Sequence, residues 1–394
     1  MPDKMTVIFY RYDSICEEDY IDAFKALGME VCEITAEMKD KDLPASKRVE
    51  LVHNAIEAHS PLFVFSINFF PAVADICFIH KVLYLCQTVD SPMVTLFSPS
   101  VRHSTNRIFL FDRAQFERFS CYNPGNIYHL PLASAVKRYD AVISGISEED
   151  RQRFNGDIAF VGSLYSEKNP LNGVEFSEYT RGFINGISDM QGLIYGSNLL
   201  ERSLSDRCVK ELKEKLPKYF AFDDPVEPTD AYIAANSVIG MELAQKERIK
   251  TLNLLAEHFE TILYTRSDTS ALRGVTVRGG VKTHTEMPKI FNISKINLNI
   301  TIRPIESGLP LRIFDIMGSG GFVLTNYQAE ITDLFEPGKE LEVYTDYEEL
   351  VLKCRYYLEH EEERKRIAEN GYNKVAQCYT CELRVMEMLK LILS

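Results

Sequence analysis

Two charged residues, Arg312 and Asp315, interrupt the otherwise apolar run ESGLPLRIFDIMGSGG, which spans residues 306–321 and has three glycines among its last four residues. We expect a helix that begins near Ser307–Gly308 and carries Pro310 in its first turn, where a missing N–H group is tolerated. At about 100° per residue, Arg312 and Asp315 share one narrow face of that helix. Two interpretations are open. The pair is either an internal ion pair, or a ligand-binding face on which Ser307–Gly308 amides bind an anion and Asp315 accepts hydrogen bonds from sugar hydroxyls.

Further candidate residues directly follow predicted strands, because ligands of open α/β sheets bind beyond the carboxyl ends of the strands. Gly162 and Ser163 close the strand-like run at 158–165 and would present backbone N–H groups to a diphosphate, with an ordinary turn as the alternative. Arg248 and Lys250 stand near the start of a predicted helix. They would supply positive charge to an anionic ligand, unless they form only a solvated helix face.

The N-terminal part of the chain also places polar residues after strands. Asp13, Asn68 and Asp90 each follow an apolar run and would line a ligand site. Asp90 and Asp13 carry carboxylates that can act as a general base. For Asp90, the alternative is a turn-forming role before Ser-Pro.

Composition limits the function classes. The chain of 394 residues has a net charge of −13 and an isoelectric point near 5.2, which argues against a broad nucleic-acid-binding surface. No run of about 18 apolar residues predicts a membrane span, and the N-terminus lacks the apolar segment of a signal peptide. We therefore expect a cytoplasmic protein.

Metal and cofactor motifs are missing from the sequence pattern. Cys378 and Cys381 form the only CxxC among nine cysteines, with no second pair at zinc spacing, and no two histidines stand at i,i+4. No GxGxxG or GxxxxGK[ST] pattern follows a strand, so dinucleotide and P-loop interpretations lose support. We expect no bound metal and no cofactor.

Strands and helices alternate along two parts of the chain, which predicts parallel sheets with helices on both faces. Only helical segments are expected after residue 326, and the expected strands lie at 5–12, 29–34, 62–67, 81–90, 107–112, 126–132, 158–165, 261–266, 275–281, 295–301 and 321–326. The first part, residues 1–150, and the second, residues 151–375, each read as a Rossmann-like α/β domain, and a cleft is expected between them. The charged stretch 144–157 suits a linker, residues 172–245 suit a helical insertion, and residues 376–394 suit a bracing helix.

The first helix carries its own boundary signals. Ser14 and Glu17 have the spacing of a capping box, and Gly28 is placed to end the helix.

Longer segments resemble a known family. Residues 294–375 resemble the nucleotide-sugar-binding half of GT-B glycosyltransferases of the group 1 family, and are most similar to the CgeB-like (spore maturation protein) group. Residues 65–77, 89–98 and 160–169 resemble the same group. The resemblance implies a GT-B fold and metal-independent transfer of a hexose or N-acetylhexosamine from a nucleotide-diphosphate sugar, with a UDP-sugar as the expected donor. Asp13, Asn68 and Asp90 would then line the acceptor site, and Asp90 or Asp13 would be the general base if the transfer inverts the sugar. The acceptor hydroxyl stays open among glycan, protein and small molecule.

The resemblance also implies site residues. The retaining members of the family carry a Glu-x7-Glu motif, whose second position falls at Asp315 and implies a ribose contact. The first position falls at Ser307, with Glu306 one residue early, so the hexose contact of the family is displaced here. The predicted donor-binding residues are Gly162, Ser163, Gly280, Val281, Thr283, His284, Glu306, Ser307, Gly308, Leu309, Arg312 and Asp315, and the predicted catalytic residues are Arg248, Lys250, Asp90 and Asp13.

Two other function classes stay open from the sequence. One is an epimerase of the same fold that acts on a UDP-N-acetylhexosamine, and the other is a non-catalytic subunit that binds a nucleotide sugar for a partner. The sequence predicts neither the oligomeric state nor the acceptor.

Overall fold

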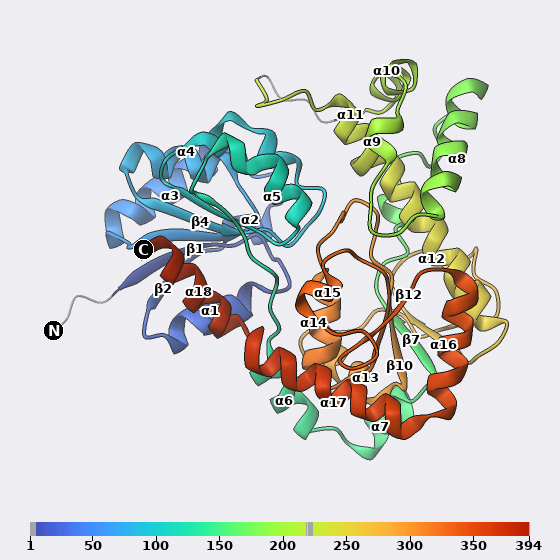
Figure 1. Cartoon of the computed structure of the whole chain (residues 1–394). Coiled ribbons are helices and arrows are strands. Elements are labelled where there is room, and N and C mark those ends of the chain that lie inside the picture. Colours follow the sequence, from blue (N-terminus) through green and yellow to red (C-terminus); the bar gives the residue numbers. More distant parts are fainter. Residues whose placement is uncertain (1–4, 218, 220–223, 394) are drawn as a thin grey trace. The chain divides into compact units, whose positions relative to one another are not determined.

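The computed structural model describes residues 5–217, 219 and 224–393, which fall into two compact units. Unit 1 contains residues 5–133, 224–227 and 379–393, and unit 2 contains the remaining described residues. Each unit is an α/β layer structure built on one parallel sheet (Figure 1). The expected α/β class with two Rossmann-like parts is confirmed.

The sheet of unit 1 has six parallel strands in the order β2-β1-β3-β4-β5-β6. Its central strands are apolar on both faces, as is usual where helices cover both sides of a parallel sheet. Phe9 and Phe65 are neighbours in the register of β1 and β3, and both are fully buried. The strands are β1 (Thr6–Tyr10), β2 (Glu30–Ile34), β3 (Phe63–Ile67), β4 (Leu83–Gln87), β5 (Asn106–Leu110) and β6 (Ile127–His129).

The helices of unit 1 cover the two faces of this sheet. Helices α1 and α18 pack against each other on one face, and α3 and α4 pack against each other on the other (Figure 1). The helices are α1 (Glu17–Ala26), α2 (Ala36–Lys39), α3 (Ala45–His59), α4 (Pro71–His80), α5 (Arg113–Phe119) and α18 (Cys381–Leu393), with short 3-10 turns η1 (Val94–Phe97), η2 (Pro99–Arg102) and η3 (Ser120–Tyr122).

The sheet of unit 2 also has six parallel strands, in the order β12-β11-β10-β7-β8-β9. The last of these strands in the chain, β12, was not expected from the sequence, which predicted only helical segments after residue 326. The strands are β7 (Ile158–Val161), β8 (Thr261–Tyr264), β9 (Thr276–Val277), β10 (Ile296–Asn299), β11 (Val323–Asn326) and β12 (Glu342–Tyr344).

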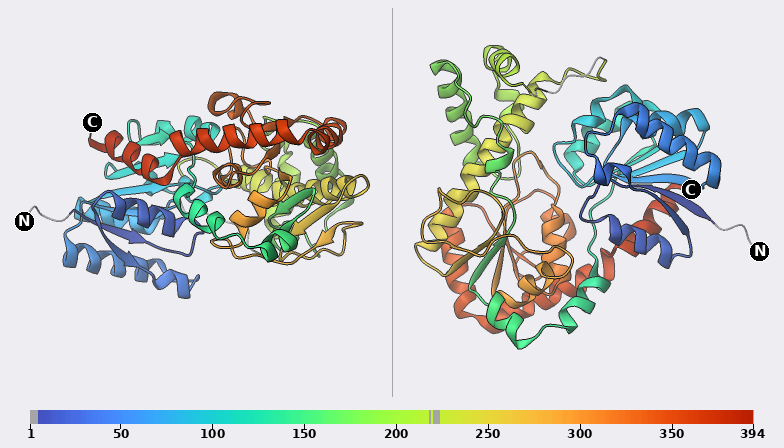
Figure 2. Two further views of the ribbon diagram at one scale, coloured as in Figure 1. Left: turned by 90° about the horizontal axis from the view of Figure 1, so that it is seen from below. Right: turned by 180° about the vertical axis from the view of Figure 1, so that it is seen from behind.

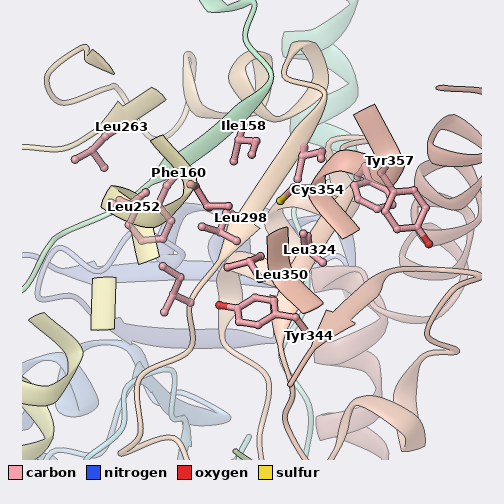
Figure 3. Close-up of a cluster of buried hydrophobic side chains, with 14 of the residues drawn as sticks. Ile158, Phe160, Leu252, Leu263, Leu298, Leu324, Tyr344, Leu350, Cys354 and Tyr357 are labelled. Atoms are coloured by element: carbon pink, nitrogen blue, oxygen red, sulfur yellow. The ribbon is translucent and has the colours of Figure 1, made fainter. Parts of the chain in front are cut away.

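Helices cover both faces of the second sheet (Figure 2). On one face, α12 and α16 bury an apolar cluster that includes Phe160, Leu252, Leu298 and Cys354 (Figure 3). Helices α13 and α14 pack together and contact strands β7 and β10. The helices outside the insertion are α6 (Val136–Ser144), α7 (Glu148–Phe154), α12 (Gly240–Ala256), α13 (Met287–Ile293), α14 (Leu311–Gly318), α15 (Ile331–Leu334), α16 (Tyr347–Glu359) and α17 (Glu361–Cys378), with the 3-10 turn η4 (Ser166–Lys168).

The expected helical insertion follows β7 and has an apolar core of its own. Leu171, Ile184, Leu212 and Val238 belong to this core. Its elements are α8 (Glu178–Gly192), α9 (Leu200–Ser203), α10 (Asp206–Lys215), α11 (Asp230–Tyr232) and the π-helix η5 (Ile233–Ile239). Helix α12 begins at Gly240, directly after η5. Arg248 therefore lies in the middle of a helix and not at its start.

Several predicted boundaries are wrong. The stretch 144–157 is not an open linker, because it contains α7, whose first turn is closed by a capping box of Ser147 and Asp150. The first boundary between the units along the chain lies between Ala133 and Ser134, and not at residue 150. Helices α6 and α7 therefore belong to unit 2. The hydrogen bonds of this capping box stabilise a helix within the charged stretch 144–157.

The capping box predicted at Ser14 is not formed. Cys16 is the N-cap of α1 and makes no side-chain cap. The buried carboxylate of Glu17 instead accepts hydrogen bonds from the Tyr12 and Asp13 amides, at 2.8 and 3.2 Å. Glu17 also pairs with Arg11 at 3.1 Å, so its carboxylate is used by these partners.

No helix among the described residues combines the length and the apolar character needed to cross a bilayer.

Candidate functional site

The strand order of unit 2 identifies one position where a ligand site is expected. From β7 the chain adds β8 and β9 on one side, then crosses over and adds β10, β11 and β12 on the other. Neighbouring strands β7 and β10 therefore mark the topological switch point, and open α/β sheets bind ligands beyond the carboxyl ends of such strands. Gly162 and Ser163 follow β7, and Ile300 follows β10.

Arg248 of α12 spans this switch point. Its Nη1 donates to the Ser163 carbonyl at 2.5 Å and its Nη2 donates to the Ile300 carbonyl at 2.9 Å. The guanidinium also lies over the rings of Phe160 and Tyr165, with its central carbon 5.2 and 4.5 Å from the ring centroids. Its buried Nε atom has no hydrogen-bond partner among the described residues.

The charge of Arg248 is held in a partly dehydrated place. Burial lowers the pKa of Arg248 below its ordinary value, and the nearby charge of Arg312 lowers that pKa further. An arginine nevertheless stays protonated near neutral pH. A desolvated positive charge bonded to two carbonyls, rather than to a carboxylate, favours an anionic ligand at this sheet edge.

The predicted roles of Gly162 and Ser163 are changed by their hydrogen bonds. The Gly162 amide donates to the Tyr264 carbonyl at 3.0 Å as a continuation of the sheet, so the prediction that this amide binds a diphosphate is wrong for this conformation. The Ser163 hydroxyl donates to the Glu167 carboxylate at 2.6 Å. A Cβ atom on Gly162 would lie 3.3 Å from the Phe160 ring and 3.8 Å from Arg248 Nη1, so even alanine at this position requires the Phe160 ring to shift slightly.

Lys250 does not join Arg248. Residues two apart on a helix point about 200° away from each other, so they occupy different faces of α12. The Lys250 ammonium lies 4.4 Å from the centroid of the Tyr347 ring. Lys250 also lines a cavity of about 390 Å³ together with Lys246, Tyr195 and Asp346, among others. The prediction that Arg248 and Lys250 act as one pair is therefore not supported by their geometry.

Asp315 is a buried, hydrogen-bonded residue. Its Oδ1 accepts from the Tyr139 hydroxyl at 2.6 Å, and its Oδ2 lies 3.3 Å from Arg312 Nη1. The predicted ion pair between Arg312 and Asp315 is confirmed. Only 2% of Asp315 is exposed, and its carboxylate already has two partners, so a ribose contact would require one of them to give way. That contact stays a prediction.

The segment before α14 forms a loop and not the first turn of the helix. Pro310 is the N-cap in an extended conformation, so the free amides of the helix start at Leu311 and not at Ser307–Gly308. The Ser307 hydroxyl donates to Glu330 at 2.8 Å, and the Gly308 carbonyl accepts from Gln328 at 3.4 Å.

The two other predicted donor-binding residues of this segment differ in exposure. Leu309 is buried, whereas Glu306 is partly exposed. The sequence placed this helix start too early because Pro310, which suits a first turn, stands just outside it.

The loop that contains the predicted donor-binding residues Gly280, Val281, Thr283 and His284 lies after β9. Gly279 has a φ of 72°, and a Cβ atom on Gly280 would lie 2.5 Å from the Arg266 side chain, so both positions favour glycine. The His284 carbonyl accepts from Arg138 at 3.1 Å. Val281 and Thr283 are partly exposed.

Unit 1 has its own switch point, between β1 and β3. Asn68 follows β3 in the left-handed region, with a φ of 63°, and its Nδ2 donates to Asp90 Oδ2 and to the Tyr12 hydroxyl, each at 2.6 Å. Asn68 Oδ1 accepts from the Val89 amide at 2.9 Å. Burial, together with the charge of Asp90, raises the pKa of Tyr12. A buried amide thus orients the exposed Asp90 carboxylate.

Asp13 lies outside that cluster in the described part of the chain. Its exposed carboxylate is 3.8 Å from the Lys41 ammonium. The structure brings Asn68 and Asp90 together, as their positions after neighbouring strands predicted, and it leaves Asp13 beside Lys41.

Sequence reasoning missed Tyr139, Tyr165 and Gln328 as contacts of the candidate residues. Tyr139 lies 176 positions from Asp315, and no local pattern links the two. Tyr165 adopts a left-handed φ of 66°, which is uncommon for an aromatic residue and brings its ring to Arg248.

Comparisons with known proteins support a common architecture. Residues 247–390 match the family model described as "Glycosyl transferase-like". That match begins in the middle of α12 and ends within α18, and it includes Arg248 and the run that contains Asp315. No curated protein matches the chain.

Solved structures match almost the whole chain at low identity. HepE from Anabaena, solved with UDP and glucose, is 11% identical with a TM-score of 0.56, over 98% of this chain and 99% of that one. A glycosyltransferase from Rickettsia africae is 10% identical with a TM-score of 0.53, over 99% and 98%. Sucrose-phosphate synthase from Thermosynechococcus elongatus is 10% identical with a TM-score of 0.51, again over 99% and 98%. The fold of this chain is therefore the GT-B fold.

Proposed function

We propose that the protein is a glycosyltransferase that transfers a hexose or N-acetylhexosamine from a UDP-sugar to a hydroxyl of an acceptor. The observation that carries this proposal is Arg248, a desolvated guanidinium across the switch point of unit 2, whose buried Nε atom has no hydrogen-bond partner in the described part of the chain. A GT-B fold and the partial match to the "Glycosyl transferase-like" model support the same activity. HepE, one of the similar structures, was solved with UDP-glucose as well as with UDP and glucose.

In this proposal, unit 2 binds the donor. The bond between the anomeric carbon and the β-phosphate oxygen breaks, and the departing UDP gains negative charge. Arg248 stabilises that charge by hydrogen bonding and by its field, which act strongly where water is excluded. Arg312 adds a second positive charge. Its charge is close enough to Arg248 to lower the pKa of Arg248.

The acceptor oxygen forms the new bond to the anomeric carbon. In a retaining reaction the departing phosphate takes the acceptor proton, and the protein contributes positioning and charge stabilisation. The position of Asp315 in a Glu-x7-Glu-like pattern supports the retaining course. We assign acceptor recognition to Asp90, which Asn68 orients in unit 1. No metal is required in this scheme, since arginine residues carry the charge compensation.

Calorimetric titration with UDP tests the donor assignment. We expect Arg248→Ala to bind UDP about 10- to 100-fold more weakly than the wild type, because a hydrogen bond to a charged group contributes about 1.5–3 kcal/mol. Arg273→Ala is the matched control, since Arg273 is an exposed arginine of the same unit. Near-UV circular dichroism of both variants checks that the fold is intact.

Unchanged UDP affinity in a folded Arg248→Ala variant would reject the role of this residue. Incubation of the wild type with UDP-sugars alone separates the remaining classes. An epimerase makes a new sugar nucleotide, a transferase slowly hydrolyses its donor, and a non-catalytic subunit binds the donor without either reaction.

A further inference from the structure

Three potential metal ligands meet on the helical surface of unit 1. His53 and Glu57 lie on α3, and His80 is the last residue of α4, which packs beside α3. One ligand atom from each of these residues lies within 4.8 Å of the others. We call these three residues the His–Glu cluster.

The contacts in the His–Glu cluster are close to those around a metal ion. His53 Nδ1 is 2.8 Å from His80 Nε2, and His80 Nδ1 is 3.3 Å from a Glu57 carboxylate oxygen. Ligand atoms bound to one tetrahedral Zn²⁺ at 2.0–2.1 Å are about 3.3 Å apart. Rotations of the exposed His53 and Glu57 side chains toward the partly buried His80 would therefore turn three atoms toward a common centre. A ring nitrogen of His80 that now takes part in a hydrogen bond would become a metal ligand.

The hydrogen bond between His53 and His80 also indicates that a ring nitrogen can offer a lone pair to a cation. Only one of two facing imidazole nitrogens can donate a proton to the other, so at least one lone pair points into the cluster. Glu57 adds a negative charge. Glu57 lies in the last turn of α3 and His80 ends α4, and the carboxyl ends of helices favour positive charge.

The geometry points to a surface site for a divalent metal ion that accepts nitrogen and oxygen ligands. Zn²⁺ is the ion that we expect, and Ni²⁺ and Cu²⁺ bind similar ligands. His53, Glu57 and His80 supply three ligands, and water completes the coordination. Mg²⁺ and Ca²⁺ prefer sites built of oxygen ligands, so they are not expected to compete. A bound ion would join α3 to α4 and stabilise unit 1, because ligands that bind only the folded state raise its stability.

Calorimetric titration of tag-free protein with ZnCl₂ tests this proposal. We expect one ion per chain for the wild type, a higher melting temperature with Zn²⁺, and no isotherm with MgCl₂. His53→Ala and His80→Ala should each weaken Zn²⁺ binding about tenfold or more, since even partners of metal ligands contribute 10–100-fold. His59→Ala, an exposed histidine on the same helix, should bind like the wild type.

The protein also has nine free cysteines, of which Cys121 and Cys378 are exposed, so thiolates must be distinguished from the His–Glu cluster. Co²⁺ spectra serve this purpose, because thiolate ligands give charge-transfer bands that nitrogen and oxygen ligands lack. The proposal is overturned if the wild type binds no Zn²⁺, if His80→Ala binds it as well as the wild type, or if the Co²⁺ spectrum shows thiolate bands. None of these results depends on the activity of unit 2.

Discussion

Gly318 allows the last turn of α14 to approach the segment that precedes α6. A Cβ atom at this position would lie 2.0 Å from Ser134 Oγ and 3.4 Å from the Tyr139 ring. This close approach is what brings the Tyr139 hydroxyl within 2.6 Å of Asp315. The glycine is thus required by packing, and it supports the polar contact next to it.

We expect Gly318→Ala to destabilise the protein by about 1–3 kcal/mol, because the added methyl group overpacks a filled space. Gly182→Ala is the matched control, since Gly182 lies in helix α8 with nothing within 4 Å of its built Cβ. That variant should be neutral or more stable by up to about 1 kcal/mol, because alanine favours helix. Urea unfolding measures both, and equal stability of the two variants would contradict the packing argument.

At the residue scale, the sequence predicted contacts between residues that are close together in the chain. Arg312 and Asp315 stand three residues apart on a helix, and their pair is confirmed. Tyr139 could not be predicted, because its contact joins residues 176 positions apart. The Gly162 amide was predicted wrongly because its partner, the Tyr264 carbonyl, depends on how β7 and β8 are paired.

At the scale of elements, the insertion is held together by a carboxylate. Glu211 of α10 accepts hydrogen bonds from the Ser177 amide and hydroxyl, each at 2.6 Å, and from the Thr180 hydroxyl at 2.5 Å. These bonds cap the first turn of α8 from a neighbouring helix. The hydrogen bonds from Ser177 and Thr180 lower the pKa of Glu211 from 4.5 to about 2.

The contribution of Glu211 to stability should depend on pH. The folded state holds this carboxyl at a lower pKa than the unfolded state, so the unfolded state binds more protons between the two values. The stabilisation is complete above pH 4.5 and is lost as the pH falls toward about 2. We expect Glu211→Gln to flatten the fall of the urea midpoint between pH 4.5 and pH 3, the upper part of this range. Glu214→Gln, an exposed glutamate of the same helix, should keep the slope of the wild type. A Glu211→Gln slope equal to that of the wild type would contradict this cause.

The sequence predicted most strands, because their apolar runs are bounded by turn residues. It missed β12, which is three residues long and contains a glutamate. It misread the segment at 144–157 because a polar, charged stretch can form a short capped helix as well as a linker. It also placed the start of α14 several residues early. Proline suits both the N-cap region and the first turn, so Pro310 fits two possible helix starts.

At the scale of the whole molecule, the His–Glu cluster and α18 show what topology adds to the sequence. His53 and Glu57 are four positions apart, but His80 reaches them only because α3 and α4 lie side by side. Likewise, residues 379–393 belong to unit 1, although they follow unit 2 in the chain. The bracing role expected for this helix could be predicted from its apolar spacing, whereas its partner α1 could not.

Met388 tests the role of α18. It is 1% exposed, and we expect Met388→Ala to destabilise unit 1 by about 2–5 kcal/mol, as is usual for a buried methionine. Met386→Ala, on the same helix but partly exposed, should have a smaller effect. Hydrogen exchange locates the change, and amides of β1 and β3 should exchange faster in Met388→Ala while those of β7 and β10 stay protected. Equal acceleration in both sheets would contradict the assignment of α18 to unit 1.

The placement of α18 also sets an order of events during translation. The ribosome releases the strands of unit 1 first, but the side of α1 that α18 covers stays open until residues 379–393 emerge. Domains generally fold as units during synthesis. Unit 2 can therefore finish folding before unit 1 does, and a released chain truncated after residue 378 should contain a folded unit 2 and an incomplete unit 1 that attracts chaperones.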